Sequence, residues 1–285
     1  MKVAIIGANG QLGSDLVGVF ENNHEVFKLN HTDIDVSNFE MSRTIIKSIN
    51  PELIINTAAY HNVSDCETNP RIAYEVNAVG ALNIARISDE ISAFNVYYST
   101  DYIFDGKKNA PYNEKDLPSP LNVYANTKLS GEQYTLNYTS KAYVLRISGI
   151  YGTVPSRVKG GNFISNIVKA SKIKHEIRVV EDEVFTPTAT YEIALMTEKI
   201  IDKDAFGLYH FTAEGKTNWY NFTKEIFKYL DIKTPLYSAK ASDFPQNVKR
   251  PYYSVLDNNS LNQLDIGRFG QWDDMLFDFL DKNYT

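Results

Sequence analysis

The chain has 285 residues, a length that suits one large α/β unit or a nucleotide-binding domain with a smaller companion. Hydrophobic residues make up 43% of it and charged residues 22%, which is enough apolar material for a sizeable core and excludes global disorder. The net charge of −6 arises without any basic block, and this argues against nucleic-acid binding.

The single cysteine, Cys66, allows neither an internal disulfide nor a cysteine-rich metal site, so we expect a cytoplasmic protein without a bound metal. The apolar run Val3–Ile6 is too short for a signal peptide, and no stretch is long enough for a membrane span. His61 and His210 have no partner at metal-ligand spacing, which favours a packed or surface position for both.

Short apolar runs alternate with longer amphipathic segments through the first half of the chain. The predicted strands are Val3–Ile6, His24–Leu29, Leu53–Asn56, Val96–Ser99 and Tyr143–Arg146. The predicted helices are Gln11–Glu21, Met41–Ile49, Ile72–Phe94 and Tyr124–Tyr138. Strands that alternate with helices predict an α/β fold with a doubly wound parallel sheet of the Rossmann type.

The second half is less regular and contains no repeat or long linker. We predict helices at Asn162–Ser171, Tyr191–Ile201 and Trp219–Leu230, and strands at Ile177–Val180 and Gly207–Phe211. The expected division is a dinucleotide-binding domain at residues 1–152 and a smaller substrate-binding lobe at residues 153–285, with segments of the lobe returning to the main sheet.

A glycine motif follows the first predicted strand and opens the first helix. Its G-x-x-G-x-x-G spacing lets the backbone turn tightly and approach a pyrophosphate, whose charge sits at the helix N-terminus. The alternative is a glycine-rich turn that only packs a helix against a strand. On the first interpretation the cofactor-binding residues are Gly7, Asn9, Gly10, Gln11, Leu12 and Gly13.

The end of the second strand bears on the choice of cofactor. An acidic residue there would hold a ribose 2′-hydroxyl, but the chain has Asn30-His31, with no arginine nearby either. His31 can contact a 2′-phosphate or simply be solvated. We therefore expect NADPH or NADH, with NADPH slightly favoured, and we place Asp35 and Val36 at the adenine.

A Tyr-x-x-x-Lys pair, Tyr124 and Lys128, lies on the predicted helix after the fourth strand. The spacing puts both side chains on one helix face, and a neighbouring ammonium is expected to lower the pKa of the tyrosine so that it can act as a general acid or base. The fourth strand ends in Ser99-Thr100-Asp101, at the sheet edge where ligands bind. Capping of the following loop is the alternative role for Thr100 and Asp101.

Together these motifs resemble the dTDP-4-dehydrorhamnose reductase family of the extended short-chain dehydrogenase/reductase superfamily, over nearly the whole chain. The string Tyr98-Ser99-Thr100-Asp101-Tyr102-Ile103-Phe104-Asp105-Gly106 is its most specific part. The other stretches that carry the resemblance are Gly7 to Gly13, Ala58 to Glu67, Val76 to Gly80, Tyr124 to Glu132, and Arg250-Pro251 with Leu256-Asp257.

The resemblance implies a reductase of the 4-keto group of a nucleotide-activated 6-deoxyhexose, which serves deoxysugar and polysaccharide biosynthesis. Tyr124 would donate the proton to the nascent alkoxide, Lys128 would bind the nicotinamide ribose and assist Tyr124, and Thr100 would orient the carbonyl. The remaining cofactor contacts that it implies are Ala58, Ala59, Tyr60 and, in support of the proton relay, Asn77. We also expect a homodimer.

Two departures from the family pattern bear on the sugar. Gly149 stands where the family has a tryptophan, and Phe185 stands where it has a glycine. They imply a reshaped pocket that works poorly on the usual 4-keto-rhamnose. The expected substrate-binding residues are Ser99, Thr100, Asp101, Gly149 and Arg250; Arg157 and Lys159 are further candidates for the diphosphate.

Two alternatives remain open from the sequence. One is a nucleotide-sugar reductase or epimerase with a different sugar. The other is a non-catalytic subunit, since proteins resembling this family regulate methionine adenosyltransferase. The intact Thr100, Tyr124 and Lys128 argue against a purely regulatory role.

Overall fold

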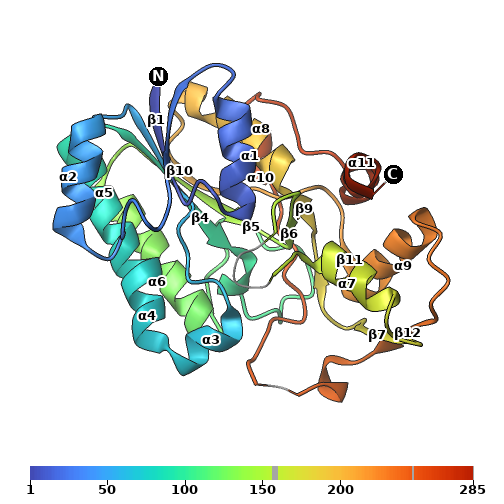
Figure 1. Cartoon of the computed structure of the whole chain (residues 1–285). Helices are drawn as coiled ribbons and strands as arrows, with labels where there is room; N and C mark the ends of the chain where they lie inside the picture. The colour runs from blue at the N-terminus through green and yellow to red at the C-terminus, as the bar shows by residue number, and fades with distance from the viewer. Residues whose placement is uncertain (156–159, 246, 285) are drawn as a thin grey trace.

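A computed structural model describes residues 1–155, 160–245 and 247–284 of the chain. Its centre is a six-stranded parallel sheet with the strand order β10-β5-β4-β3-β1-β2 (Figure 1). The strands of this sheet are β1 (Lys2–Ile6), β2 (Glu25–Leu29), β3 (Leu53–Asn56), β4 (Phe94–Thr100), β5 (Ala142–Ile147) and β10 (Gly207–His210).

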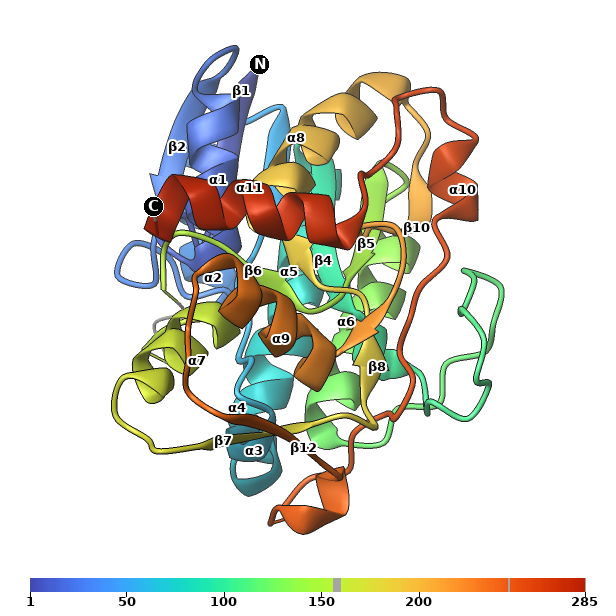
Figure 2. The ribbon, with the colours of Figure 1, turned by 90° about the vertical axis from the view of Figure 1, so that its right-hand side faces the viewer.

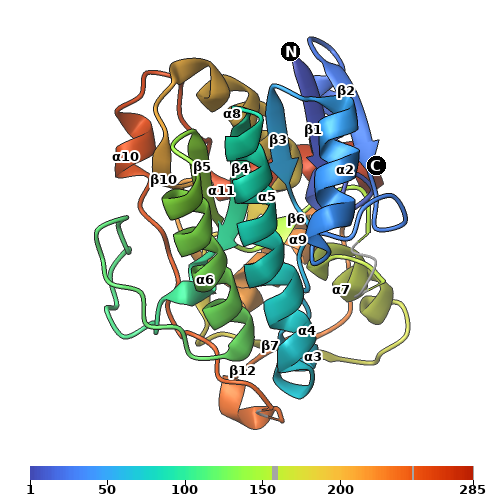
Figure 3. The ribbon, with the colours of Figure 1, turned by 90° about the vertical axis from the view of Figure 1, so that its left-hand side faces the viewer.

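Helices cover both faces of the sheet. Figure 3 shows α2 (Phe39–Ile49), α5 (Gly80–Glu90) and α6 (Val123–Tyr138) side by side on one face. Figure 2 shows α1 (Gln11–Phe20), α8 (Thr190–Ile200) and α11 (Trp272–Tyr284) over the other, where α1 packs against α8. The predicted doubly wound parallel sheet is confirmed. None of the helices that the structure describes is long and apolar enough to cross a membrane.

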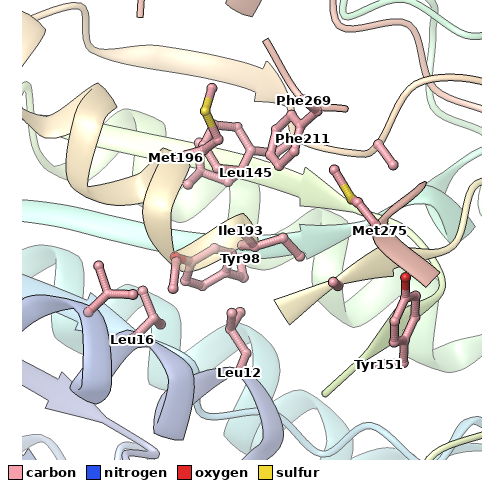
Figure 4. Packing of buried hydrophobic residues seen from close by; sticks show 14 of the residues in the cluster. Leu12, Leu16, Tyr98, Leu145, Tyr151, Ile193, Met196, Phe211, Phe269 and Met275 are labelled. Carbon is pink, nitrogen blue, oxygen red and sulfur yellow. The ribbon is translucent and has the colours of Figure 1, made fainter. Parts of the chain in front are cut away.

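Apolar strand residues form the core because both faces of the sheet are covered, and the inner strands β1, β3, β4 and β5 are almost wholly buried, whereas the edge strand β2 is partly exposed. Between the sheet and the pair α1 and α8, Tyr98 lies among Leu12, Leu16 and Ile193 (Figure 4). The Tyr98 hydroxyl is not left unsatisfied, since it shares a 2.7 Å hydrogen bond with the Thr197 hydroxyl on α8. This core fixes the strand ends that carry the site.

The helix predicted at Ile72–Phe94 is confirmed up to Glu90, but it contains a π-helical turn and ends four residues early. The structure has α4 (Pro70–Tyr74), a π-helical turn (Glu75–Val79) and α5 in succession, and Phe94 already belongs to β4. Ser92 has a φ of 58°, in the left-handed region that ends a helix. Helical periodicity alone shows neither the extra residue of a π turn nor this reversal.

A smaller group of elements lies at the carboxyl ends of the sheet strands (Figure 2). Three short two-stranded sheets belong to the second half of the chain: β6 with β9, β8 with β11, and β7 with β12. The bounds of these strands are β6 (Ile150–Tyr151), β9 (Thr188–Ala189), β8 (Val184–Phe185), β11 (Thr217–Asn218), β7 (Ile177–Val180) and β12 (Leu236–Ala239). The remaining α-helices are α3 (Val63–Thr68), α7 (Phe163–Ser171), α9 (Trp219–Tyr229) and α10 (Asn259–Asn262), and 3-10 turns lie at Asp101–Ile103, Ile201–Lys203 and Ala241–Asp243.

Strand β10 comes from the second half of the chain and pairs with β5 at the edge of the main sheet. The lobe and the sheet are therefore connected by more than one crossing of the chain. The division at residues 152 and 153 stays a prediction.

Candidate active site

The chain reverses its direction of winding across the sheet between β1 and β3, which lie side by side. Just beyond β1, the Gly7 amide donates to the Leu29 carbonyl at 2.8 Å, and the Thr57 amide donates to the Ile6 carbonyl at 3.0 Å. These bonds hold three strand ends together at one edge. In doubly wound folds ligands bind in the crevice at such a switch point.

The glycine motif turns tightly at this edge. Gly7 has a φ of 80°, and a Cβ on it would lie 2.5 Å from the Thr57 hydroxyl. A Cβ on Gly13 would lie 2.1 Å from the Gly7 carbonyl oxygen, so α1 can approach β1 only with glycine at this position. Helix α1 begins after Gly10 with no side-chain cap and no acidic residue in its first turn. Its N-terminus therefore suits a phosphate anion.

The loop after β2 is organised by its own acidic side chains. Asp33 accepts the Asn30 amide at 2.8 Å, while Asp35 accepts the amide and the hydroxyl of Ser37 at 3.0 and 2.7 Å. Val36 is buried, and a Cβ added to Gly80 would lie 2.6 Å from its side chain. Asn30, Asp35 and Val36 thus line one loop beside the glycine motif, and their contacts with adenosine stay predictions.

On the opposite side of the motif, Asn77 connects the segment after β3 to helix α6. Its side chain accepts the Tyr60 amide at 2.8 Å and donates to the Tyr60 carbonyl at 3.0 Å. It also donates to the Thr127 hydroxyl at 2.9 Å, and Thr127 lies between Tyr124 and Lys128 in the sequence. Asn77 therefore positions the Tyr60 segment, which follows Ala58 and Ala59, relative to the expected catalytic helix.

Helix α6 starts at an asparagine cap: the Asn122 side chain accepts the Ala125 amide at 2.9 Å. Tyr124 therefore lies in the first turn, and the Thr100 side chain is close enough to its phenol to act on its pKa. Burial raises the pKa of Tyr124, so the lowered pKa expected from the sequence is wrong for the chain without cofactor. A neutral phenol is the form that can give a proton to a substrate.

Lys128 follows one turn later and is 3% exposed. Its Nζ lies 4.0 Å from the centre of the Tyr97 ring. Burial lowers the pKa of Lys128 to about 7, against the attraction of Glu132, which lies one further turn along α6. A small change in the surroundings of Lys128 is therefore enough to change its protonation state near neutral pH.

At the end of β4, Thr100 donates to Asp101 Oδ1 at 3.1 Å and accepts the Tyr102 amide at 3.2 Å. Asp101 is 4% exposed and also accepts hydroxyl groups from Ser148 and Ser254 on Oδ2, at 2.9 and 2.5 Å. Burial raises the pKa of Asp101 to about 6. Its carboxylate is thus enclosed by hydroxyl groups, and the substrate contact expected of Asp101 from the sequence stays a prediction.

Ser99 was expected beside the substrate, and its side chain is 2% exposed. Strand alternation places it on the opposite face from Thr100. Its hydroxyl has no hydrogen-bond partner in the described part of the chain. The structure brings Thr100 to Tyr124 and does not bring Ser99 there.

The two departures noted in the sequence lie against each other. Gly149 has a φ of 53°, and a Cβ on it would lie 2.5 Å from two carbon atoms of the Phe185 ring. That ring stacks on Trp219 with 3.9 Å between centroids. A side chain at position 149 and a phenyl ring at 185 therefore exclude each other.

Arg250 is exposed and lies close to the start of α6, because the Asn122 side chain donates to the neighbouring Lys249 carbonyl at 2.9 Å. Tyr102 lies within the electrostatic influence of Arg250 and of Tyr124. Arg157 and Lys159 fall outside the described residues. No group of three or more His, Cys, Asp or Glu side chains in the described ranges could hold a metal ion.

The residues that sequence reasoning missed are Ser148, Ser254, Glu132 and Arg146. Arg146 donates to both carboxylate oxygens of Glu132, at 2.9 and 2.8 Å, and both side chains are almost fully buried. Glu132 follows Tyr124 and Lys128 at the same four-residue spacing, a signal that was available in the sequence. Nothing local marks the two serines, since they reach Asp101 from distant segments.

Comparison with known proteins places this geometry in a family. A curated dTDP-4-dehydrorhamnose reductase from Aggregatibacter actinomycetemcomitans is 35% identical over 277 residues, covering 92% of each chain. A dTDP-4-keto-6-deoxy-D-glucose reductase from Streptomyces niveus is 29% identical, over 94% of this chain and 92% of its own. The crystal structure of a dTDP-4-dehydrorhamnose reductase from Bacillus anthracis, in complex with NADP, superimposes with a TM-score of 0.94 and 32% identity, covering 99% of each chain.

The family model described as the RmlD substrate binding domain matches residues 1–285. This match spans the glycine motif, the end of β4 and helix α6 together. The chain therefore belongs to the RmlD substrate binding domain family.

Proposed function

We propose that the chain is an NAD(P)H-dependent oxidoreductase that reduces the 4-keto group of a nucleotide-activated 6-deoxyhexose. The observation that carries this is the position of Tyr124, a half-buried neutral phenol beside Thr100 at the sheet edge that also holds the glycine motif. The relatives named dTDP-4-dehydrorhamnose reductase, and the NADP complex of one of them, support the same reaction and cofactor class.

The residues present suit a dinucleotide. The approach of Gly13 to Gly7 leaves no room for a Cβ, and the N-terminus of α1 has no side-chain cap to compete with a pyrophosphate. A bound reduced nicotinamide would supply the hydride. Asn77 holds the Tyr60 segment close to α6, so that Ala58, Ala59, Tyr60 and Lys128 lie on the side of the motif where the nicotinamide and its ribose would be bound.

Tyr124 acts as the general acid in this mechanism. Its phenol gives its proton to the substrate oxygen as negative charge develops there, and Thr100 orients the carbonyl. Lys128 assists because a cation close to the phenolate stabilises the charge that remains on Tyr124. Arg250, whose neighbour Lys249 accepts the Asn122 side chain at the start of α6, would bind the diphosphate, since anionic groups need fixed positive partners.

The choice between NADPH and NADH rests on the loop after β2. The residue at the end of β2 is Asn30 and not an acid, so no carboxylate stands at the position that takes a ribose 2′-hydroxyl, and Asp33 Oδ2 accepts the Asn30 amide instead. NADPH should therefore bind at least as well as NADH, which direct titration of both cofactors would test.

The identity of the sugar stays open between two reductase substrates. Gly149 and Phe185 pack as a pair, so the volume of a side chain at position 149 is filled from β8 instead. This favours a reshaped sugar site and a sugar other than 4-keto-rhamnose. The Streptomyces niveus relative, named as a reductase of dTDP-4-keto-6-deoxy-D-glucose, supports a search beyond rhamnose. The cytoplasmic location and the homodimer stay predictions.

The experiment that tests the function replaces Tyr124 by Phe. Loss of a general acid should lower turnover of the 4-keto sugar by roughly 10²–10⁴-fold while NADPH affinity stays nearly unchanged. Tyr138→Phe on the same helix is the matched control, because Tyr138 is 47% exposed and far along α6 from the first turn. Turnover of the Tyr124→Phe variant within a few-fold of the parent would remove this residue from the role.

A further inference from the structure

Asp101 makes contacts that the proposed reaction does not account for. Its buried carboxylate accepts three hydroxyl hydrogens, from Thr100, Ser148 and Ser254. No lysine, arginine or histidine forms an ion pair with it within 4.0 Å in the part of the chain that the structure describes. A buried carboxylate without a cation is costly, so the three hydrogen bonds must offset much of that cost.

The three donors come from three different segments. Thr100 ends β4, Ser148 precedes Gly149 after β5, and Ser254 follows Arg250 by four residues, 153 positions from Asp101 in the sequence. Each segment holds a residue expected to contact the substrate. Asp101 therefore lies where three parts of the proposed site meet. These parts are expected to contact the carbonyl group (Thr100), the sugar ring (Gly149) and the diphosphate (Arg250).

The segment that carries Arg250 and Ser254 crosses the lobe in extended form and bonds to two other segments. Its Ser254 amide donates to the Val184 carbonyl at 2.8 Å, and its Val255 carbonyl accepts the Tyr112 amide at 2.9 Å. Those bonds fix the backbone of the segment to β8 and to the loop before α6. The Ser254 hydroxyl adds the link to the end of β4, next to Thr100.

We propose that Asp101 is a positioning residue, which ties the segment of Arg250 and Ser254 and the segment of Ser148 and Gly149 to the reacting end of β4. This rests on the proposed reductase function. Asp101 does not touch the reacting atoms. It keeps the groups that bind the nucleotide sugar at a fixed distance from Thr100 and Tyr124, so that a bound carbonyl meets the phenol. Tyr102 and Tyr124 are the titratable side chains that feel its charge.

The test removes one of the three donors. Ser254→Ala should raise the KM for the 4-keto sugar about tenfold, the typical effect of losing one hydrogen bond to a charged group, with kcat within about threefold of the parent. The dissociation constant of NADPH should not change, because the glycine motif lies on the other side of Thr100. Ser88→Ala is the matched control: Ser88 is also fully buried, but its hydroxyl only bonds the Ile84 carbonyl within α5.

Two further measurements are independent of turnover. In the Ser254→Ala variant, amide hydrogen exchange in residues 251–257 should become faster, and the dissociation constant of dTDP-glucose, a non-reacting probe, should rise by about as much as KM. Ser148→Ala removes the other donor to Asp101 Oδ2 and should raise the KM for the 4-keto sugar in the same way. This variant replaces Ser254→Ala in the test if Ser254→Ala does not fold.

The outcomes separate this proposal from the function on which it rests. A parent protein that neither reduces a 4-keto sugar nor binds dTDP-glucose overturns both. A parent that is active, with a Ser254→Ala variant whose KM is unchanged or whose kcat alone falls, overturns the positioning role of Asp101 and leaves the function standing. An equal loss of NADPH and sugar affinity also overturns it, because that would be general loosening of the fold.

Discussion

Two buried carboxylates lie on either side of Tyr124 and Lys128, and they are compensated in different ways. The Glu132 carboxylate accepts two hydrogen bonds from the Arg146 guanidinium, from Nε at 2.9 Å and from Nη2 at 2.8 Å. Asp101 accepts hydrogen bonds from the hydroxyl groups of three side chains, and burial raises its pKa to about 6. The first arrangement pairs two opposite charges. The second leaves a carboxyl group that changes its charge in mildly acidic solution.

The ion pair of Glu132 and Arg146 also contacts a histidine, His210. Arg146 Nη1 lies 3.3 Å from His210 Nε2, and a guanidinium can only donate, so Nε2 must be the unprotonated acceptor. The Nδ1 hydrogen then donates to the Asp257 carbonyl at 3.1 Å. Burial, together with the charge of Arg146, lowers the pKa of His210 to about 3. Helix α6 is thus anchored to β5 and β10 by a network in which His210 stays neutral.

The largest effect is expected when the paired carboxylate loses its partner. Arg146→Met leaves the Glu132 charge buried and alone, which should lower the free energy of unfolding by about 3–5 kcal/mol at pH 7. The double variant Glu132→Leu/Arg146→Met should recover most of that loss, because neither charge remains. Denaturant unfolding of the parent, both single variants and the double variant measures this. Strictly additive single losses would show that the ion pair is not the stabilising unit.

The next effect concerns the histidine of the same network. The unfolded chain takes up a proton on His210 below pH 6.5, whereas the folded chain does so only near pH 3. Unfolding is therefore favoured as pH falls from 6.5 to 4, by roughly 3 kcal/mol at pH 4. His210→Gln keeps one acceptor and one donor and removes this loss. Parallel slopes of unfolding free energy against pH for variant and parent would contradict the assignment.

Asp101 should give a slope of the opposite sign. Because its pKa is raised when the chain folds, the folded state binds the proton more tightly, and this contribution to stability falls as pH rises from about 4 to 6. Asp101→Asn removes that titration. The stability of the variant relative to the parent should therefore rise by up to about 3 kcal/mol over this range and stay level above it. A relative stability that does not depend on pH would mean that Asp101 titrates as an ordinary carboxyl group.

The fold could largely be predicted because strands buried on both faces are short apolar runs, as at Leu53–Asn56, and because the helices between them show amphipathic spacing. Side-chain caps such as Asn122 and Asn162 mark helix starts that were placed within one residue. The partner strand of Ile177–Val180 and the C-terminal helix Trp272–Tyr284 were not predicted, since each is defined by contacts with elements distant in the sequence.

In the candidate site, too, some residues could be predicted from local spacing and others could not. The roles of Gly7, Tyr124 and Lys128 could be predicted from the sequence because they depend on local spacing within one turn or one helix. The partners of Asp101 are not, because Ser148 and Ser254 reach it across 47 and 153 residues. The direction of the pKa shift of Tyr124 was also missed, since it depends on burial, which spacing does not reveal.

The central claim is that Tyr124 protonates a 4-keto nucleotide sugar during reduction by NAD(P)H. The most direct measurement follows NADPH oxidation by the parent and by Tyr124→Phe with a panel of dTDP-, UDP-, GDP- and CDP-4-keto-6-deoxy sugars. We predict that oxidation by the parent depends on at least one of these sugars and that it falls by roughly 10²–10⁴-fold in the variant. A parent that oxidises NADPH with none of them, or a variant that does so as fast as the parent, would contradict the claim.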